Sequence, residues 1–360
     1  MPNGSTNWTP DDADGTLAGM ERRVAIIGDG AMGTVSAVML VENGWEVRLW
    51  SAFPEAAEQL ARTRENKRFL PGHRLTDQVH VTGDDAKALA GASLVISAVP
   101  TQFMRGVWQR LRQYVPADLP ICSVTKGIEN RTLLRPTQIL LDVLDGQDQA
   151  GRGRKQRAVA ALSGPSIAPE VARGLPATVT VASNDEAFAA AVQQMYKRPY
   201  FRVYTNSDLV GVEIAGATKN VIAIAAGILD GLGSGDNAKA ALLTRGLVEI
   251  TRLGVALGAR AETFAGLAGV GDLVTTCISP IGRNRSFGEA VGRGRTVAEA
   301  LSATESIVEG VATTASVAEL AGKVGVEMPI TRAVHGVLFG GRKPADAVAE
   351  LMTRPLKAEG

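Results

Sequence analysis

One lysine, Lys219, interrupts a long apolar segment, residues 210–227, which reads VGVEIAGATKNVIAIAAG. The chain has 38 Lys and Arg residues, of which only ten are lysines, so a lysine in such surroundings is conspicuous. Burial disfavours the ammonium form and lowers the pKa of a lysine toward neutrality, which suits a group that exchanges protons. The alternative is a lysine whose stem lies on the helix and whose ammonium reaches water. Its position in the middle of the segment favours a general acid and base.

A glycine-rich stretch, GDGAMG at residues 28–33, follows the apolar run 24–27 and precedes a helix-like segment. In this G-x-G-x-x-G pattern Gly28 allows a tight turn, Gly30 lets a pyrophosphate approach the backbone, and Gly33 allows close helix–strand packing. The diphosphate would then lie at the helix N-terminus. The alternative is a glycine turn in any parallel sheet, but the strand before and the helix after favour a dinucleotide site.

Two further polar groups follow expected strands. Lys126 comes just after the strand at 121–124, and the turn Ser163-Gly164-Pro165-Ser166 follows the strand at 158–162. Open α/β sheets place their ligands at this edge. Taken singly, Lys126 is equally well explained as a surface lysine, and the turn at 163–166 is no more than a turn.

The second half of the chain carries two more candidates. In GVGDLVTTC, Asp272 and Thr276 are four residues apart and so share a face if the segment is helical. Gly282-Arg283-Asn284-Arg285 is a glycine-flanked turn whose arginine and amide suit a phosphate or a carboxylate. A solvated basic loop is the alternative.

The order of apolar segments predicts the elements that must position these residues. Strands alternate with helices as far as residue 204, which predicts an α/β fold with an N-terminal Rossmann-type, doubly wound, mostly parallel sheet. From about residue 206 only helices are expected, so the C-terminal domain is predicted to be all-α. The expected division is a disordered tail at 1–20, a dinucleotide-binding domain at 21–205 and a substrate and catalytic domain at 206–360. Helices are expected, among others, over residues 132–144, 210–229 and 262–268.

Composition excludes several classes of protein. A net charge of +1 provides no field for nucleic acid or an anionic membrane. Two distant cysteines and three histidines show no metal-ligand spacing and no disulfide framework, which favours a reducing, cytoplasmic location. The first twenty residues lack the features of a secretion signal, and Glu213 and Lys219 interrupt the most apolar segment, so no membrane span is expected. The small-residue helices of the second half offer an interface for a homodimer.

Taken together, the motifs resemble the bacterial-type NAD(P)-dependent glycerol-3-phosphate dehydrogenases, from about residue 22 to residue 351. The resemblance rests on GDGAMGT (28–34), VTKGIE (124–129), SGPSIAPEVARGLPA (163–177), GATKNVIAIAAG (216–227), GDLVTTC (271–277), GRNRSFG (282–288) and VEG (308–310). The first motif is common to many dehydrogenases, whereas the order and spacing of the others are specific.

The resemblance implies a role for individual positions. Lys219 matches the proton donor and acceptor, with Lys126 adding positive potential and Asp272 orienting Lys219 or the substrate hydroxyl. The implied substrate-binding residues are Lys126, Gly164, Ser166, Lys219, Asp272, Thr276, Gly282, Arg283 and Asn284. The implied cofactor-binding residues are Gly28, Gly30, Ala31, Met32, Gly33, Ala52, Lys126, Ala168, Arg283, Ile307 and Glu309.

The choice between NAD and NADP depends on the end of the second strand, where an acid binds the ribose of NAD or a basic group accepts the 2′-phosphate of NADP. Ser51, Ala52 and Phe53 supply neither group. Because no acid there would repel a phosphate, and Arg48 or Arg62 could reach it, the sequence slightly favours NADP.

The resulting prediction is an enzyme that transfers a hydride between NAD(P)H and dihydroxyacetone phosphate, giving sn-glycerol 3-phosphate for phospholipid synthesis. One alternative is a related two-domain reductase acting on a β-hydroxy acid or a ketopantoate-like carboxylate, which the Arg283–Asn284 fork could also hold. An alternative of another class is a non-catalytic NAD(P)-binding sensor, which gives no reason for Lys126, Lys219 and Asp272 to occur together.

Overall fold

The structure, a computed structural model, describes residues 22–146, 157–304, 307–356 and 358. The predicted tail, residues 1–20, lies outside the described residues. The chain divides into two units: unit 1 comprises Met1–Lys126 and Arg135–Val212, and unit 2 comprises Gly127–Leu134 and Glu213–Gly360. This division differs from the expected one at 205/206 in two respects. The cut falls a few residues later, and the short segment 127–134 belongs with the helical unit.

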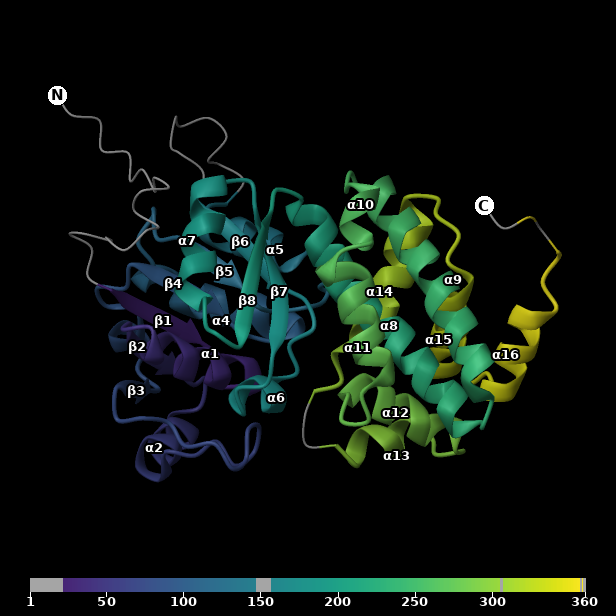
Figure 1. Ribbon diagram of the computed structural model, residues 1–360, viewed down its shortest axis with the longest axis horizontal. Helices are drawn as coiled ribbons and strands as arrows, with labels where there is room; N and C mark the ends of the chain where they lie inside the picture. The colour runs from purple at the N-terminus through teal and green to yellow at the C-terminus, as the bar shows by residue number, and fades with distance from the viewer. Residues whose placement is uncertain (1–21, 147–156, 305–306, 357, 359–360) are drawn as a thin grey trace. The chain divides into compact units, whose positions relative to one another are not determined.

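Unit 1 is built on one eight-stranded sheet with the order β3-β2-β1-β4-β5-β6-β7-β8 (Figure 1). All neighbouring strands are parallel except β6 and β7, which confirms the expected Rossmann-type, mostly parallel sheet. The strands are β1 (Arg23–Ile27), β2 (Glu46–Trp50), β3 (Val79–Thr82), β4 (Leu94–Ser97), β5 (Ile121–Ser123), β6 (Val159–Ser163), β7 (Ala177–Ser183) and β8 (Phe201–Asn206).

Helices cover both faces of this sheet. The order moves from β1 to β2 in one direction and from β4 to β5 in the other, so right-handed crossovers put α1 and α4 on opposite faces. Helix α1 contacts α6 and α7, whereas α4 contacts α5. The helices of unit 1 are α1 (Ala31–Glu42), α2 (Pro54–Thr63), α3 (Asp85–Leu89), α4 (Thr101–Leu111), the 3₁₀ turn η2 (Arg112–Tyr114), α5 (Pro136–Leu144), α6 (Ala168–Ala172) and α7 (Glu186–Tyr196).

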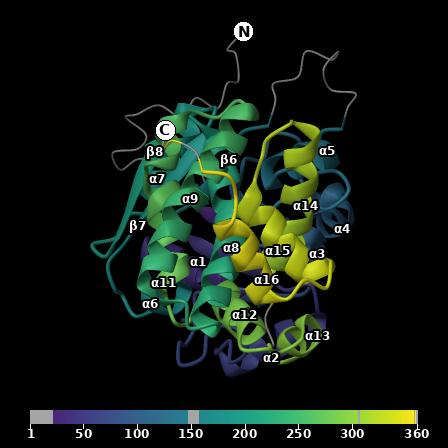
Figure 2. The same ribbon diagram turned by 90° about the vertical axis from the view of Figure 1, so that its right-hand side faces the viewer.

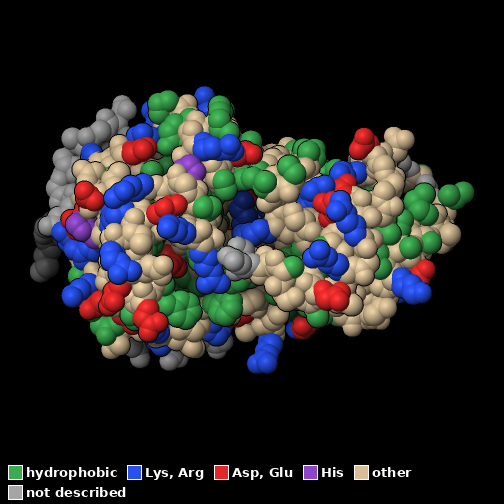
Figure 3. Space-filling model, turned by 90° about the horizontal axis from the view of Figure 1, so that it is seen from below, with side chains coloured by type: hydrophobic (Ala, Val, Ile, Leu, Met, Phe, Trp, Pro, Cys, Tyr) green, Lys and Arg blue, Asp and Glu red, His purple; other side chains and the backbone are tan. Residues whose placement is uncertain are grey.

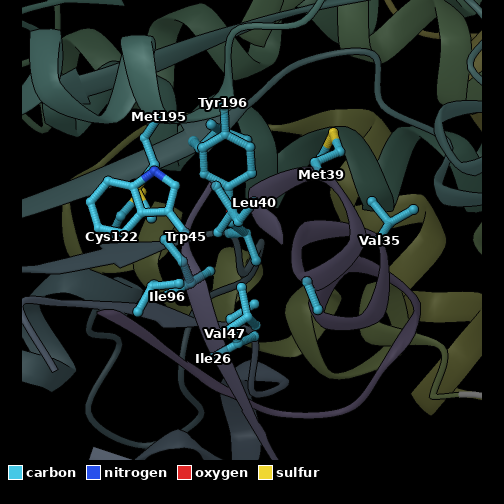
Figure 4. Packing of buried hydrophobic residues seen from close by; sticks show 14 of the residues in the cluster. Ile26, Val35, Met39, Leu40, Trp45, Val47, Ile96, Cys122, Met195 and Tyr196 are labelled. Carbon is cyan, nitrogen blue, oxygen red and sulfur yellow. The ribbon is translucent and has the colours of Figure 1, made fainter. Parts of the chain in front are cut away.

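The apolar core of unit 1 holds α1 against the sheet. Figure 4 shows Leu40 of α1 among Trp45, Val47 and Tyr196, all of them buried. The Tyr196 hydroxyl donates to the hydroxyl of Ser36 at 3.0 Å, which ties α7 to α1 inside this core. Burial raises the pKa of Tyr196, so this hydroxyl stays protonated and remains a donor. The packing therefore fixes the middle and the C-terminal part of α1 against the sheet.

Two predicted helices differ from those observed. Helix α5 begins at Pro136 and not at residue 132, because Arg131 and Leu133 have φ of 72° and 59°, which no α-helix allows. The helix expected over 262–268 is replaced by α10 (Ala261–Phe264) and a π-helical turn, η4 (Leu267–Gly271).

Unit 2 is helical, as predicted, and α8 (Leu209–Gly231) runs through its centre (Figure 2). By length and composition α8 is the one single helix of the described chain that could cross a membrane, but 94% of its most apolar window is buried inside the structure. It is therefore the core helix of unit 2, and its apolar composition is explained by burial. The other helices are α9 (Gly235–Ala256), α10, η4, α11 (Asp272–Ile278), α12 (Arg283–Gly292), α13 (Val297–Ser302), α14 (Glu309–Lys323), α15 (Pro329–Phe339) and α16 (Pro344–Met352).

Glycines bring α8 and α12 into direct backbone contact. A Cβ on Gly288 would lie 2.1 Å from the carbonyl oxygen of Ile224, and one on Gly227 would lie 1.9 Å from that of Arg285. No side chain fits at either position without separating the helices. The crossing thus sets how far the start of α12 lies from the middle of α8.

Replacing Gly288 by alanine is expected to lower the free energy of unfolding by about 1–3 kcal/mol, the usual cost of overpacking. Gly322→Ala in α14 is the matched control, because nothing lies within 4 Å of the added Cβ there. That variant should be neutral or gain up to about 1 kcal/mol of helix propensity. Urea unfolding of both variants measures the difference, and equal stabilities would contradict the role of the α8–α12 contact.

A buried carboxyl group, Glu249, is expected to make the stability of unit 2 depend on pH. Glu249 of α9 is 4% exposed and accepts the backbone N–H groups of Ile330 at 2.6 Å and Thr331 at 3.2 Å, at the start of α15. Burial raises the pKa of Glu249 from 4.5 to about 7, although both hydrogen bonds oppose the rise. The folded state therefore binds this proton more tightly than the unfolded state does.

The stabilising contribution of Glu249 is complete below pH 4.5 and is lost as the pH rises through about 7. We expect the free energy of unfolding to fall by up to about 3 kcal/mol over this range because of this group. The Glu249→Gln variant should lack this component, so the difference between the two stability curves should grow from pH 5 to pH 8. Curves that stay parallel would show that Glu249 does not titrate in this range.

Charged groups of both signs are mixed on one face of the molecule. On the face drawn in Figure 3, Lys and Arg side chains are interspersed with Asp and Glu side chains. This agrees with the net charge of +1.

Candidate active site

Lys219 lies on α8 and is buried, with 6% of its surface exposed. Its Nζ donates to Asp272 Oδ1 at 2.6 Å and to Thr276 Oγ1 at 2.5 Å. Asp272 is itself 2% exposed, so the pair is an ion pair removed from water. The carboxylate stabilises the ammonium inside an apolar helix core, a partner that the apolar pattern around Lys219 does not reveal.

Helix α11 supplies both partners of Lys219. Asp272 is its first residue, after the turn η4, and Thr276 follows one turn later. Their contacts with one Nζ confirm that they share a helix face. The Thr276 hydroxyl lies 3.4 Å from Asp272 Oδ1, so the three polar groups form one connected cluster. Burial raises the pKa of the neighbouring Cys277 thiol to about 12, which makes this cysteine unreactive.

The segment Gly282-Arg283-Asn284 begins a helix and is not the glycine-flanked turn that the sequence predicted, nor the solvated loop that was its alternative. Gly282 is the N-cap of α12, and Arg283 and Asn284 are its first residues. Asn284 is buried, donates to Asn220 Oδ1 at 2.9 Å and accepts the backbone N–H of Gly310 at 3.0 Å. Its side chain therefore joins α8, α12 and α14.

The adjacent Arg283, which is exposed, contacts the segment just before α14. Its Nη1 donates to the carbonyl of Ile307 at 3.1 Å, and Ile307 is 44% exposed. Glu309, the first residue of α14, lies between the two contacts. Arg283 and Asn284 thus hold the start of α12 against the segment 307–310, which includes Ile307 and Glu309.

Lys126, Gly164 and Ser166 meet at the carboxyl edge of the sheet in unit 1. Lys126 Nζ and Ser166 Oγ each donate to the carbonyl of Gly164 at 3.1 Å. Gly164 has φ +140°, and a Cβ there would lie 2.9 Å from Val179 Cα, so only glycine fits. Ala168 begins α6 one turn further along and is buried.

The glycine-rich turn has the shape that a pyrophosphate needs. Gly28 has φ +112°, and a Cβ on Gly33 would lie 1.9 Å from the carbonyl of Gly28, so both positions require glycine. At Gly30, in contrast, nothing lies within 4 Å of an added Cβ, and this open space adjoins the first N–H groups of α1, which begins at Ala31 and Met32. These residues fit a dinucleotide.

A supporting residue for this turn was missed from the sequence. Asn66 is buried, and its Nδ2 donates to the carbonyl of Asp29 at 2.6 Å and to Thr34 Oγ1 at 2.8 Å. A single amide thus holds the middle of the turn and the start of α1. Asn220 was missed in the same way. Asn220 lies in the motif GATKNVIAIAAG, whereas Asn66 lies in none of the motifs, and the role of each follows from the burial of its hydrogen-bonded amide, which the sequence does not show.

The end of β2 corrects one interpretation of the sequence. Arg48 is not available to a phosphate, because its Nη1 donates to the carbonyls of Lys87 and Ala90 at 2.7 Å each and its Nη2 pairs with Glu46. Arg62 is exposed, but it lies eight residues along α2 from Pro54, about 12 Å at 1.5 Å per residue. Ser51 is buried, and Phe53 is 71% exposed.

The fold and these clusters define a two-unit, nicotinamide-dependent oxidoreductase: a dinucleotide-binding sheet in unit 1 and a buried Lys–Asp pair in the helical unit 2. Family models described as the N-terminus and the C-terminus of NAD-dependent glycerol-3-phosphate dehydrogenase match residues 23–189 and 208–349. The chain belongs to this family.

Individual relatives agree over nearly the whole chain. A glycerol-3-phosphate dehydrogenase [NAD(P)+] from Geobacter sp. strain M21 is 49% identical over 95% of this chain and 100% of its own length. One from Corynebacterium glutamicum strain R is 45% identical over 93% of this chain and 99% of its own. The crystal structure of glycerol-3-phosphate dehydrogenase from Coxiella burnetii has a TM-score of 0.87 at 38% identity, covering 92% of this chain and 99% of that chain.

A ketopantoate reductase from Ralstonia eutropha shares the fold alone, with a TM-score of 0.54 at 17% identity over 91% of this chain and 99% of its own. The fold class predicted from the sequence is therefore confirmed, and the family favours glycerol 3-phosphate over a ketopantoate-like substrate. The cofactor is NAD or NADP, as in the relatives.

Proposed function

We propose that the protein interconverts dihydroxyacetone phosphate and sn-glycerol 3-phosphate with NAD or NADP, with phospholipid synthesis as the purpose. The observation that carries this proposal is the buried cluster of Lys219, Asp272 and Thr276, because reduction of a ketone needs a proton donor at the carbonyl oxygen. The names of the relatives support the choice of substrate.

When bound, the nicotinamide cofactor supplies or accepts the hydride. Lys219 Nζ gives its proton to the carbonyl oxygen during reduction and takes the hydroxyl proton during oxidation. Asp272 and Thr276 hold Nζ in one orientation through the 2.6 Å and 2.5 Å contacts. Lys126 adds positive charge that stabilises the developing alkoxide.

The phosphate of the substrate is assigned to the start of α12. Because the Asn284 side chain is occupied by Asn220 and Gly310, it supports this end of the helix, and the phosphate is held by the Arg283 guanidinium and the first N–H groups after Gly282. Arg283 then exchanges its contact with the Ile307 carbonyl for a charge-assisted one.

The remaining assignments stay predictions from the resemblance. Substrate contacts are proposed for Gly164 and Ser166. Cofactor contacts are proposed for Ala31, Met32, Ala52, Ala168, Ile307 and Glu309. A homodimer through the small-residue helices of unit 2 is likewise a proposal, as is a cytoplasmic location, which the two free, buried cysteines support.

The decisive experiment follows the absorbance of reduced nicotinamide in parallel cuvettes with dihydroxyacetone phosphate and either NADH or NADPH. Loss of absorbance with the formation of glycerol 3-phosphate is the expected result. Inorganic phosphate should compete with the substrate, whereas acetate should not, because the site at α12 is built for a phosphate. Turnover of a ketoacid and none of dihydroxyacetone phosphate would support the reductase alternative, and cofactor binding without turnover of either would support a sensor.

A further inference from the structure

An arginine that lies in none of the motifs of the resemblance, Arg110, places its guanidinium beside the residues that follow β2. Arg110 of α4 forms a two-pronged ion pair with Asp85, the first residue of α3, through Nε–Oδ2 and Nη2–Oδ1 contacts of 2.7 Å each. Trp50, the last residue of β2, donates its Nε1 to the same Asp85 Oδ1 at 3.0 Å. The guanidinium carbon lies 5.2 Å from the centre of the Trp50 ring. Three of these contacts hold the guanidinium in one orientation, and the Trp50 contact holds the Asp85 carboxylate.

This guanidinium reaches the position where a dinucleotide's adenosine ribose binds. Its Nη1 donates to the carbonyl of Ala52 at 3.2 Å, and Ala52 is the second residue after β2. Arg110 is accessible there, since 43% of its side chain is exposed. Of the five N–H groups of a guanidinium three are used, so Nη1 and Nη2 each keep one that meets no acceptor among the described residues.

We propose that Arg110 recognises the 2′-phosphate of NADP, an inference that rests on the proposed use of a nicotinamide dinucleotide. A phosphate next to Ala52 would accept the two remaining N–H groups, which are fixed before it arrives. The other basic residues nearby do not compete for this role. Arg48 is occupied by two carbonyls and Glu46, and Arg62 is about 12 Å further along α2.

Asp85 limits how strongly Arg110 discriminates between NADP and NAD. Because its carboxylate neutralises the guanidinium, the site holds no uncompensated charge that would penalise NAD, which lacks the 2′-phosphate. The pair therefore accepts both cofactors and favours NADP through hydrogen bonds more than through net charge.

The test is calorimetric titration of the full-length protein with 2′,5′-ADP and, separately, with 5′-AMP, which differ by the 2′-phosphate. Arg110→Gln should lower the affinity for 2′,5′-ADP by about tenfold or more and change the affinity for 5′-AMP by less than about twofold. Arg112→Gln is the matched control, because it removes the same charge from an exposed position two residues away. Asp85→Asn, which keeps an acceptor for Trp50, should increase the affinity for 2′,5′-ADP relative to that for 5′-AMP.

An R110Q protein that binds 2′,5′-ADP as tightly as the wild type does would overturn the proposal. An equal loss of affinity for 2′,5′-ADP and 5′-AMP would also overturn it. Failure of the wild type to bind either nucleotide would overturn it as well. Because the titration needs no turnover, it is independent of whether dihydroxyacetone phosphate is the substrate. The ratio of kcat/KM for NADPH and NADH in R110Q, expected to fall by a similar factor, provides a second readout.

Discussion

Replacing Lys219 by alanine should lower kcat by about 10²–10⁴-fold, the usual contribution of a positioned general acid. The affinity for the reduced cofactor should change little, because Lys219 Nζ contacts Asp272 and Thr276 and Lys219 is not among the residues proposed to bind the cofactor. Steady-state turnover of dihydroxyacetone phosphate and fluorescence titration with NADH or NADPH measure the two quantities. A variant that keeps turnover within about threefold of the wild type would remove Lys219 from the mechanism.

Replacing Asp272 by asparagine should have the largest effect on stability. The change leaves the ammonium of Lys219 in a site that is 6% exposed and without its carboxylate, which typically costs about 3–5 kcal/mol. Urea unfolding measures this loss, and kcat should fall as well because Nζ is no longer held in place.

The double variant Lys219→Met/Asp272→Asn separates stability from chemistry. Because it removes both buried charges together, it should recover most of the stability that D272N loses, while its turnover stays as low as that of the lysine variant. A double variant that is no more stable than D272N would show that the ion pair is not the reason for the loss.

Much of the fold follows from local patterns in the sequence. The strands at 24–27 and 46–50 are short apolar or alternating runs bounded by turn residues, and both are found at nearly those positions. Errors occur where backbone geometry decides. The start of α5 depends on the positive φ of Arg131 and Leu133, and the turn η4 depends on Gly269 lying against the carbonyl of Phe264, neither of which periodicity reveals.

In the candidate site, too, local sequence patterns predict some features and tertiary packing decides the others. Asp272 and Thr276 could be placed on one face because their spacing is helical, and Lys219 stood out by its apolar neighbours. Their meeting at one Nζ depends on how α11 lies against α8, which is a matter of tertiary packing. The use of the Asn284 side chain by Asn220 and Gly310, and the pairing of Arg110 with Asp85, are likewise long-range contacts that no local pattern encodes.

The short segment 127–134 has a consequence for synthesis on the ribosome. It leaves the ribosome with unit 1 yet belongs to unit 2, where the Ile128 carbonyl accepts the hydroxyl of Ser316 on α14, 188 residues later. At translation rates of about 5–20 residues per second this partner arrives roughly 10–40 s afterwards. Unit 1 must therefore fold with this loop unpaired, and in a fragment ending at residue 205 the Ile128 carbonyl would lack the Ser316 hydroxyl that it accepts in the full chain. Co-translational folding of this chain is completed only when α14 has been made.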